Sequence, residues 1–586
     1  MMKPQYKTRR EQFEILRGQL EGERSSFMSH WRELGEYIKP RRPRFFVTDT
    51  NKGDRRNNKI IDSTASLAAR TLSAGMMGGV TSPARPWFRL TTPDPDLAEF
   101  GAVKEWLHIV TQRMSTVFLK SNIYNTLPIV YTDMGTFGTA AMSIEEDMQD
   151  VIRCYSFPVG SYMISTNHKG KVDTFFREFR YTVRQILERF GERNGDDYDW
   201  SNLSDQIKSY YLGGHLEAWV DVCHVILPNP EYNPDMLKSK YKRYLSVYYE
   251  KGTYYGGANV QLSALEGGKL LSEKGYDYFP VLCPRWETTG EDTYGTSCPG
   301  MDSLGDIKAL QVLHKRKAQA IEKMVNPPLV APTALRSTTV SLLPGNITYQ
   351  DVSQGKEGVK PIHEVRPDLQ YHIMDIQEHQ NRIRRAFFED LFLMLAQSDR
   401  REITAREIDE RHEEKLLALG PVLEQLNQDV LDPTIDITFD KMNQQGLIPE
   451  PPEELEGVDL RVEYISVMAQ AQKLIGISSL ERFSRFVGET ITATQNLSIL
   501  DKVDMDQLID EMGTALSMPP RVIRPDEEVA GIREQRAKTA QAQQQQEAMA
   551  QTAKSAKDLA GADLEKDSAL NRLLQTAKAG SAVPTA

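Results

Sequence analysis

The chain has 586 residues, of which 40% are hydrophobic and 26% charged, a composition typical of globular proteins. Its length predicts about three to four domains. The formal net charge of −11 excludes a global basic field that would attract nucleic acid, so any DNA contact would come from local patches.

The N-terminal part of the sequence is predicted to be helical. Within residues 5–38, apolar side chains recur at spacings of three, four and seven, which indicates an amphipathic helix. A second helix is expected to begin after Asp62, with Ser63 or Thr64 as its N-cap. Its small residues would permit close packing against a neighbour. Residues 102–142 predict two more helices.

The region 151–286 has a different pattern, rich in β-branched and aromatic residues. Short segments of this kind are separated by Gly, Asn and Asp, and one helix interrupts them near Val183 to Phe190. We therefore predict an α+β domain with a mostly antiparallel sheet.

Two long helices separated by a non-helical insertion follow. In the first, over 301–325, one face is apolar and the opposite face is basic, and the helix would be roughly 35–40 Å long. Two prolines end it, and residues 329–366 predict short strands and turns. The polar face carries Lys308, Lys315, Arg316, Gln319 and Lys323.

The second long helix is expected to begin at Pro367 and to end before the segment AQSDRRE (396–402). Glu378–Arg382 and Arg385–Glu389 have the i,i+4 spacing of helical ion pairs. A third long helix is predicted over about 403–430. The apolar stripe of the second helix consists of Leu369, Ile373, Ile376, Ile383, Phe387, Leu391 and Met394.

The last 61 residues, 526–586, consist mainly of Ala, Gln, Lys and Glu. They have helix propensity but few large apolar side chains. Alone, this segment predicts a frayed helix or disorder, and bundled with copies of itself it would form a tube.

Signature motifs of common enzymes are absent from the sequence. It has no GxxxxGK[ST] nucleotide loop, no GxSxG elbow and no HExxH motif, so an ATPase, a hydrolase and a zinc protease are unsupported. We predict a protein that is not an enzyme and has no cofactor.

Two polar clusters have residue types that bind metals. His372, Asp375 and His379 would lie within about 60° of one another on a helix, but this spacing is common on polar helices, and a hydrogen-bonded surface is favoured. An acidic cluster at the edge of a predicted loop lacks a companion base, which favours a solvated turn. We predict no metal site. The acidic cluster consists of Glu145, Glu146, Asp147 and Asp150.

Cysteine spacing and hydropathy bear on the compartment. Cys154, Cys223, Cys283 and Cys298 stand far apart without a CxxC motif, which favours reduced thiols over a metal knuckle or disulfides. The N-terminus lacks an apolar signal core, and no run approaches the roughly 20 apolar residues that cross a bilayer. We expect a soluble, intracellular protein without membrane contact.

Four segments, in order along the chain, resemble the portal, or head-to-tail connector, family of short-tailed tailed bacteriophages. The resemblance covers about residues 10–520 and implies a ring of about twelve subunits at one capsid vertex. The segments are IIDSTASLAARTLSAGMMGGVTSPARPWFRL (60–90), YTDMGTFGTAAM (131–142), PRWETTGEDTYGTSCPGMDSLGDIKALQ (284–311) and ITAREI (403–408).

The fold implied by the resemblance is mainly α with an α+β wing domain, and it comprises a wing, a two-helix stem, a small β-containing clip and a helical crown. The corresponding divisions are the wing at 1–299, with its mostly antiparallel β region at 151–286; stem helix 1 at 300–326; the clip at 327–366; stem helix 2 at 367–396; the tunnel loop and long wing helix at 397–430; the crown at 431–525; and a C-terminal helical barrel or disordered tail at 526–586.

The resemblance also implies a channel through which double-stranded DNA is packaged and ejected without sequence specificity. Its partners would be the terminase large subunit, a tail adaptor, and the major capsid and scaffolding proteins. It would reside at the portal vertex of the virion, and in the host cytoplasm during assembly. Candidate residues are Lys308, Lys315, Arg316 and Lys323 for the channel wall, and Gln397, Ser398, Asp399, Arg400 and Arg401 for the tunnel loop.

Alternatives remain at two levels. The exposed cations of the first long helix could equally form an ordinary solvated face, because spacing does not distinguish a pore from bulk solvent. The chain as a whole could be a tail-tube or adaptor protein that does not enclose DNA. A nuclease or ATPase of the packaging machinery is a third alternative, which the missing nucleotide loop disfavours.

Overall fold

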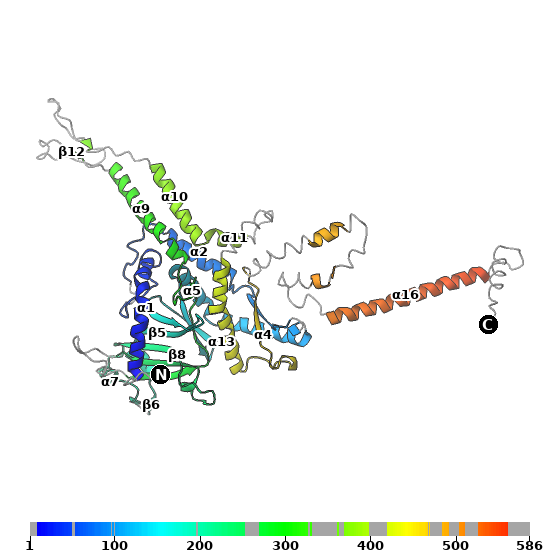
Figure 1. Cartoon of the computed structure of the whole chain (residues 1–586), viewed down its shortest axis with the longest axis horizontal. Helices are drawn as coiled ribbons and strands as arrows, with labels where there is room; N and C mark the ends of the chain where they lie inside the picture. Colours follow the sequence, from blue (N-terminus) through cyan, green and yellow to red (C-terminus); the bar gives the residue numbers. More distant parts are fainter. Residues whose placement is uncertain are drawn as a thin grey trace, which may run out of the picture.

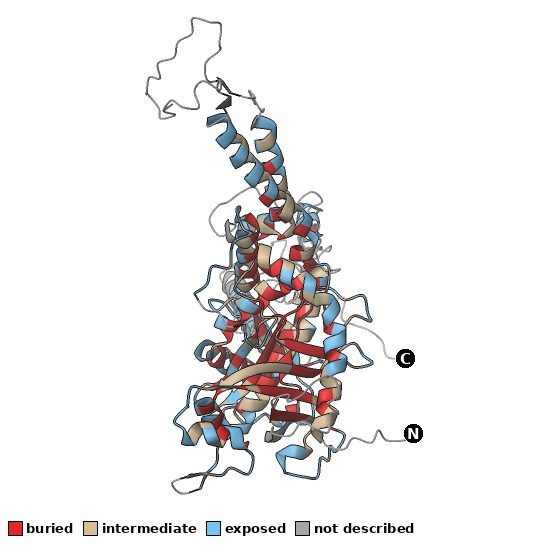
Figure 2. Ribbon diagram, turned by 90° about the vertical axis from the view of Figure 1, so that its left-hand side faces the viewer, coloured by how far each residue is buried: buried red, intermediate tan, exposed pale blue. Residues whose placement is uncertain are grey.

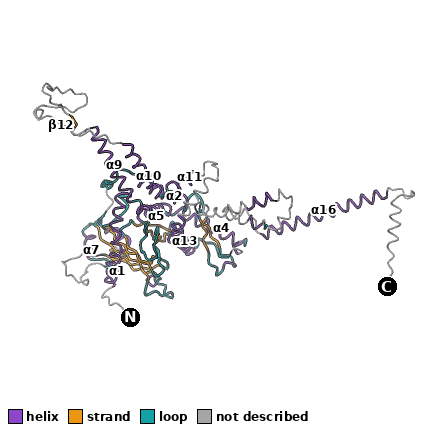
Figure 3. Tube along the Cα trace, turned by 45° about the horizontal axis from the view of Figure 1, so that its top comes forward, coloured by secondary structure: helices purple, strands orange, loops and turns teal. Residues whose placement is uncertain are grey.

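In the computed structural model, a body of helices and sheets carries a projecting pair of helices, α9 and α10, and a long C-terminal helix lies apart from the body (Figure 1). Figure 3 shows most of the strands on one side of the helices α2, α5 and α11, which lie at the base of the projecting pair, while β12 lies beyond the far end of the pair. The residues described are 9–49, 53–94, 97–98, 100–194, 197–251, 269–325, 329–330, 360–361, 369–397, 419–466, 468, 483–490, 503–504, 506–509 and 526–560.

The largest sheet has five antiparallel strands in the order β10-β9-β8-β5-β4. This confirms the antiparallel sheet that the alternating pattern predicted, and the resulting architecture is mixed α and β. Figure 2 shows these strands mostly buried. The strands are β4 (Tyr162–Thr166), β5 (Val172–Thr182), β8 (Trp219–Pro228), β9 (Tyr244–Glu250) and β10 (Leu270–Tyr276).

Helices cover both faces of this sheet. Helix α1 (Arg9–Tyr37), predicted from its periodicity, places Phe13 and Leu20 among sheet residues such as Phe176 on one face. On the other face, α6 (Val183–Phe190) and α7 (Asp205–Leu212) form a second cluster. The sheet is thus buried on both sides, and α1 forms one outer surface of the body.

A second sheet begins earlier than the sequence predicted. Helix α5 (Ile123–Phe137) ends at Gly138, whose φ of +79° favours glycine, and the chain then enters strand β2 (Ala141–Asp147). The prediction of helix up to residue 142 is therefore wrong. The sheet order is β11-β2-β3, with β3 at Val151–Phe157 and β11 at Val281–Leu282.

The helical core contains α2 (Thr64–Gly79), α4 (Gly101–Lys120) and α5, which share one large hydrophobic cluster. Ser63 occupies the N-cap position of α2, one of the two residues predicted for it, but its side chain makes no capping hydrogen bond. The carboxylate of Asp62 does this instead, because its Oδ1 accepts the Thr64 N–H at 2.8 Å.

Helical residues 419–426 continue through a π-helical turn (Asn427–Leu431) into α13 (Asp432–Gln444), beyond the end predicted near residue 430. Strand β14 (Arg461–Tyr464) then pairs antiparallel with β1 (Phe88–Thr91), so distant parts of the chain lie side by side. The shorter elements are α8 (Pro299–Asp302), β6 (Arg193–Asn194), β7 (Asp197–Tyr198) and the 3-10 turns Ser239–Tyr241 and Glu453–Leu455.

Helix α16 (Asp526–Ala560) is continuous, and where its side chains are described they are almost all exposed. It covers the first part of the segment predicted to be a barrel or a disordered tail, and residues 561–586 lie outside the described part. Among the described residues, no helix combines the length and the hydropathy needed to cross a membrane.

Candidate functional site

The projecting pair consists of α9 (Leu304–Val325) and α10 (Leu369–Ala386) (Figure 1). Residues 304–314 and 376–386 form its root, next to the body, and residues 315–325 and 369–375 form its tip. Beyond the tip, β12 (Leu329–Val330) pairs antiparallel with β13 (Lys360–Pro361), and most of the predicted clip lies outside the described residues.

The root is an integral part of the core. Ile307 and Leu310 of α9 and Ile383 of α10 are fully buried, as is Phe387 just after α10. These are positions of the two predicted apolar faces, so the periodicity correctly identified which side of each helix faces the body.

The second helix is broken, contrary to the prediction of one rod up to residue 396. α10 ends at Ala386, Phe388 has φ +55°, and α11 (Glu389–Gln397) then packs against α2. There the Phe392 ring lies where a Cβ on Gly75 would stand, about 2.1 Å from the nearest ring atom. The helix therefore breaks where tertiary packing redirects it.

The break explains why only one of the two predicted i,i+4 ion pairs forms. Glu378 and Arg382, both within α10, form theirs. Arg385 and Glu389 lie on opposite sides of the break, and Glu389 instead lies 3.8 Å from Arg384. An i,i+4 pair requires an uninterrupted helix between its members.

A polar network centred on Asp62 fixes the root to α2. The Gln311 side chain of α9 accepts the Ile61 and Asp62 backbone N–H groups at 2.7 and 2.8 Å and donates to the Asp62 carbonyl at 3.0 Å. Gln380 of α10 donates to Asp62 Oδ2 at 2.9 Å, and His314 Nε2 lies 3.2 Å from the same oxygen. One short segment thereby holds both helices.

The protonation of Asp62 follows from these contacts. Burial by itself favours the neutral acid, but hydrogen bonds from Thr64 and Gln380, with His314 nearby, hold the pKa of Asp62 below its ordinary value. The network therefore contains a carboxylate at neutral pH. The sequence analysis did not identify Gln311 and Gln380, because glutamine on an amphipathic helix usually lies at the surface. The capping role of Asp62 could have been predicted, since an aspartate just before a helix is a recognised capping signal.

The histidine cluster serves a structural contact. His379 Nδ1 lies 2.8 Å from Asp306 Oδ1 on α9, which ties the two helices together, and Asp375 lies 3.8 Å from His379 Nε2. Among the described residues, no three His, Cys, Asp or Glu side chains are arranged to hold a metal ion.

The remaining chemical candidates of the sequence lie elsewhere. Glu145, Glu146 and Asp147 form the end of strand β2, and Asp150 lies in the turn that follows, so the acidic cluster lies at the edge of a turn as predicted. All four cysteines are buried and free, and burial raises the pKa of the Cys154 thiol to about 12. At neutral pH that thiol is protonated and unreactive.

The predicted channel residues all lie on α9, in different surroundings. Lys315, Arg316 and Lys323 are exposed, and none has an ion-pair partner among the described residues. Lys308, in the root, forms an ion pair with Glu33 of α1. Lys315, Arg316 and Lys323 thus lie on one exposed stretch at the tip, whereas Lys308 contacts the body of the same chain.

The tip exposes apolar side chains instead of burying them. Val325 is 81% exposed, Tyr371 74% and Met374 63%. Ile321 and Met324 are also exposed. Of the predicted tunnel loop, Gln397 ends α11, and Ser398, Asp399, Arg400 and Arg401 lie outside the described residues.

Comparison with known proteins gives consistent matches over nearly the whole chain. Residues 10–523 match the family described as bacteriophage head to tail connecting protein. The chain is 48% identical over 561 residues to the portal protein of Salmonella phage epsilon15, covering 96% of this chain and 97% of that protein. It is 42% identical over 553 residues to a probable portal protein of Bordetella phage BPP-1, with 94% and 96% covered.

Proposed function

This chain belongs to the bacteriophage head-to-tail connecting proteins, the portal proteins, and on that premise we propose that α9 and α10 form the wall of a DNA channel in a ring of identical subunits. The ring would be closed and cyclic and would contain about twelve copies, the number that the resemblance to this family implies. Double-stranded DNA would enter and leave the capsid through its bore.

The observation that carries this proposal is the exposed apolar tip. Val325, Tyr371 and Met374 leave a large part of their side chains in water when the chain is alone. An exposed apolar patch of this kind marks an interaction surface. In a head-to-tail ring, the tips of neighbouring subunits would cover one another, and each copy would use two different faces.

The exposed cations would then face the bore. Stacked around the ring, Lys315, Arg316 and Lys323 would give narrow basic belts on an otherwise acidic protein of net charge −11. Each phosphate neutralised by a cation adds to binding, so a few belts on an acidic wall would let DNA pass without holding it. Nothing in this arrangement requires reading base edges.

The remaining assignments of the family layout form part of the same proposal. Residues 1–299 would be the wing, the helix pair the stem, 327–366 the clip and 431–525 the crown, with 397–401 in a tunnel loop. The helix that spans the 430/431 boundary and the pairing of β14 with β1 tie the first part of the proposed crown to the body. The clip would contact the terminase large subunit and then a tail adaptor, and the outer surface the major capsid and scaffolding proteins. Assembly would take place in the host cytoplasm.

The test is a charge reversal on the exposed face of α9. Replacing Lys315 and Arg316 with Glu should leave ring assembly intact and slow both DNA packaging and ejection, because the belts would then repel phosphate. Replacing the exposed Lys169 and Lys171 with Glu changes the charge equally at the turn between β4 and β5, outside the helix pair, and should change neither. Unaltered packaging and ejection in intact rings of the first variant would show that these residues do not line the channel.

Electron microscopy of the purified protein, viewed end-on, tests the ring itself. Rings with a central hole wide enough for a duplex are expected. A bore too narrow for duplex DNA would favour an adaptor that does not enclose DNA, and monomers or open filaments would contradict the ring.

A further inference from the structure

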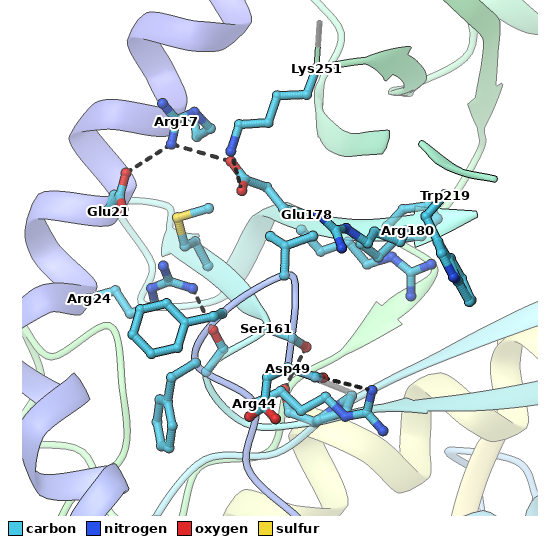
Figure 4. A pocket seen from close by; sticks show the side chains of 18 residues that line it. Arg17, Glu21, Arg24, Arg44, Asp49, Ser161, Glu178, Arg180, Trp219 and Lys251 are labelled. Carbon is cyan, nitrogen blue, oxygen red and sulfur yellow. Dashed lines mark hydrogen bonds and ion pairs between the residues drawn. The ribbon is translucent and has the colours of Figure 1, made fainter. Parts of the chain in front are cut away.

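We propose that a cavity beside α1 binds a small molecule that carries a phosphate group and a planar ring, of the chemical class of a nucleoside monophosphate. The cavity lies in the body, away from the helix pair, between α1, the loop 44–49 and strands β4 and β5 (Figure 4). Its volume of about 510 Å³ is within the range of small-molecule sites, roughly 300–1,000 Å³.

Among the charged side chains that line this cavity, cations outnumber carboxylates by six to three. Its three carboxylates are all neutralised within the chain. Arg17 pairs with Glu21 at 2.9 Å and Lys251 with Glu178 at 2.7 Å, while Asp49 pairs with Arg56, outside the cavity, at 2.7 Å. The cationic side chains that line the cavity are Arg17, Arg24, Arg44, Arg177, Arg180 and Lys251.

The guanidinium groups of Arg24, Arg44 and Arg177 form no ion pair with a carboxylate among the described residues. Arg24 donates to the Gly160 carbonyl at 2.7 Å, and Arg44 donates to the Asp49 carbonyl at 3.3 Å. The Nε atoms of Arg24 and Arg177 are buried without any hydrogen-bond acceptor. A buried donor without an acceptor is costly, and a buried charge more so, so an anion in the cavity would remove a standing penalty.

Arg177 is the most exceptional of the three. Its guanidinium lies 4.6 Å from the centre of the Phe157 ring and 4.0 Å from that of Phe179, and these ring contacts are its described partners. Burial lowers the pKa of Arg177. Arg177 also lines a second, smaller cavity together with Glu145, whose carboxylate is among its electrostatic neighbours. Ring faces stabilise a cation only weakly compared with an oxyanion that it contacts directly, so a phosphate would add the direct contact that Arg177 lacks.

The shape and aromatic content of the cavity favour a ligand larger than a bare ion. Trp219 is 56% exposed and Phe46 is 66% exposed, and both line the cavity together with Phe45 and Phe179. Guanidinium groups match phosphate oxygens in a planar fork, and exposed aromatic rings stack on nucleobases. Figure 4 shows Arg24, Arg44 and Trp219 arranged around the cavity from three different elements. A phosphate held by the arginines with its base on the aromatic rim would use both features.

The test uses the full-length protein and isothermal titration with four probes. Deoxyadenosine monophosphate should bind, inorganic phosphate should bind more weakly, and deoxyadenosine should bind at least about tenfold more weakly, because it lacks the charge. A short oligothymidylate should bind no more tightly than the monophosphate. Tighter binding of the oligonucleotide would overturn the assignment to a small molecule, and equal binding of phosphate and monophosphate would overturn the stacking.

Substitutions locate the site. Arg177→Gln and Arg44→Gln should each weaken binding of the monophosphate by about tenfold or more. Arg184→Gln, on α6 and outside the cavity, removes an exposed arginine and should bind like the unaltered protein. If Arg177→Gln fails to fold, Arg44→Gln still tests the binding site. This variant should fold, because it removes only one side-chain hydrogen bond, to the carbonyl of Asp49 in a loop. Absence of binding to the unaltered protein, or equal binding by the folded cavity variants, would overturn the proposal, whether or not the protein forms rings.

Discussion

The root and the tip of the helix pair share an amphipathic pattern but have opposite environments. Both carry apolar residues at helical spacing, yet Ile307 and Ile383 are fully buried in the root, while Val325 and Tyr371 are exposed at the tip. The root is also held by the polar contacts of Asp62 with Gln311 and Gln380.

This difference separates folding from assembly. The root obtains its partners from α2 and α11 of the same chain, so it is completed when the chain folds. The tip has an apolar surface and an exposed row of cations, which a single chain leaves in water. Substitutions at the root should therefore affect the stability of one chain, and those at the tip should affect association between chains.

The largest effect is expected from Phe387→Asp. Phe387 is fully buried, and an unpaired carboxylate there should reduce the free energy of unfolding by about 3–5 kcal/mol. Urea denaturation followed by circular dichroism measures the change. Ile373→Asp also introduces an aspartate into the predicted apolar stripe, but at the tip. There the Ile373 side chain is already 39% exposed, so the unfolding midpoint should stay nearly unchanged. Equal loss in both variants would erase the distinction between root and tip.

The double substitution Met324→Asp and Val325→Asp should weaken assembly without unfolding the chain. Both side chains are exposed in the single chain, so stability is expected to stay the same. Losing the apolar contact would cost about 1–2 kcal/mol per subunit interface, a cost repeated around the ring. Analytical ultracentrifugation should show rings dissociating at higher protein concentration than the unaltered protein. Rings of unchanged stability would mean that neighbours do not cover the tip.

Elements that depend on the local pattern of apolar and polar residues could be predicted from the sequence. The periodicity identified α1, the buried face of α9 in the root, and the antiparallel strands β3, β5, β8 and β9. Helix α6 has the predicted bounds, Val183–Phe190. The candidate cations Lys315, Arg316 and Lys323 are on the exposed face, as their spacing indicated, while their place in a channel wall remains a proposal.

Features that depend on contacts between residues far apart in the sequence could not be predicted from the local pattern. The apolar stripe runs without interruption through Phe387 and Leu391, so nothing local marks the break that Phe392 and Gly75 impose. The ion pair of Lys308 with Glu33 joins helices far apart in the sequence. The cavity beside α1 was missed for the same reason, since its arginines come from α1, a loop and a strand.

A smaller effect is expected from Asp62→Ala. The substitution removes the acceptor of the Thr64 N–H and of Gln380, and should lower the free energy of unfolding by about 2 kcal/mol. Asp54→Ala, an exposed aspartate in the same connecting segment, is the control and should change stability by less than about 0.5 kcal/mol. Since the network belongs to the root, the chain should be less stable but still able to form rings. A loss of rings without a loss of stability would place Asp62 in an interface instead.

The smallest effect is the pH dependence that the Asp62 carboxylate confers. Its pKa in the folded chain is below the ordinary value of 3.8, so the unfolded chain takes up this proton first as pH falls. The stabilisation is therefore complete above the ordinary value and is lost as pH falls through the folded pKa. Asp62→Asn keeps the shape but cannot ionise, so the difference in unfolding free energy between it and the unaltered protein should be constant near neutral pH and shrink below pH 3.8. Asp54 and Asp54→Asn, at an exposed position in the same connecting segment, are the control pair. A constant difference for Asp62 down to strong acid would mean that Gln380, Thr64 and His314 hold the side chain by shape alone and not by its charge.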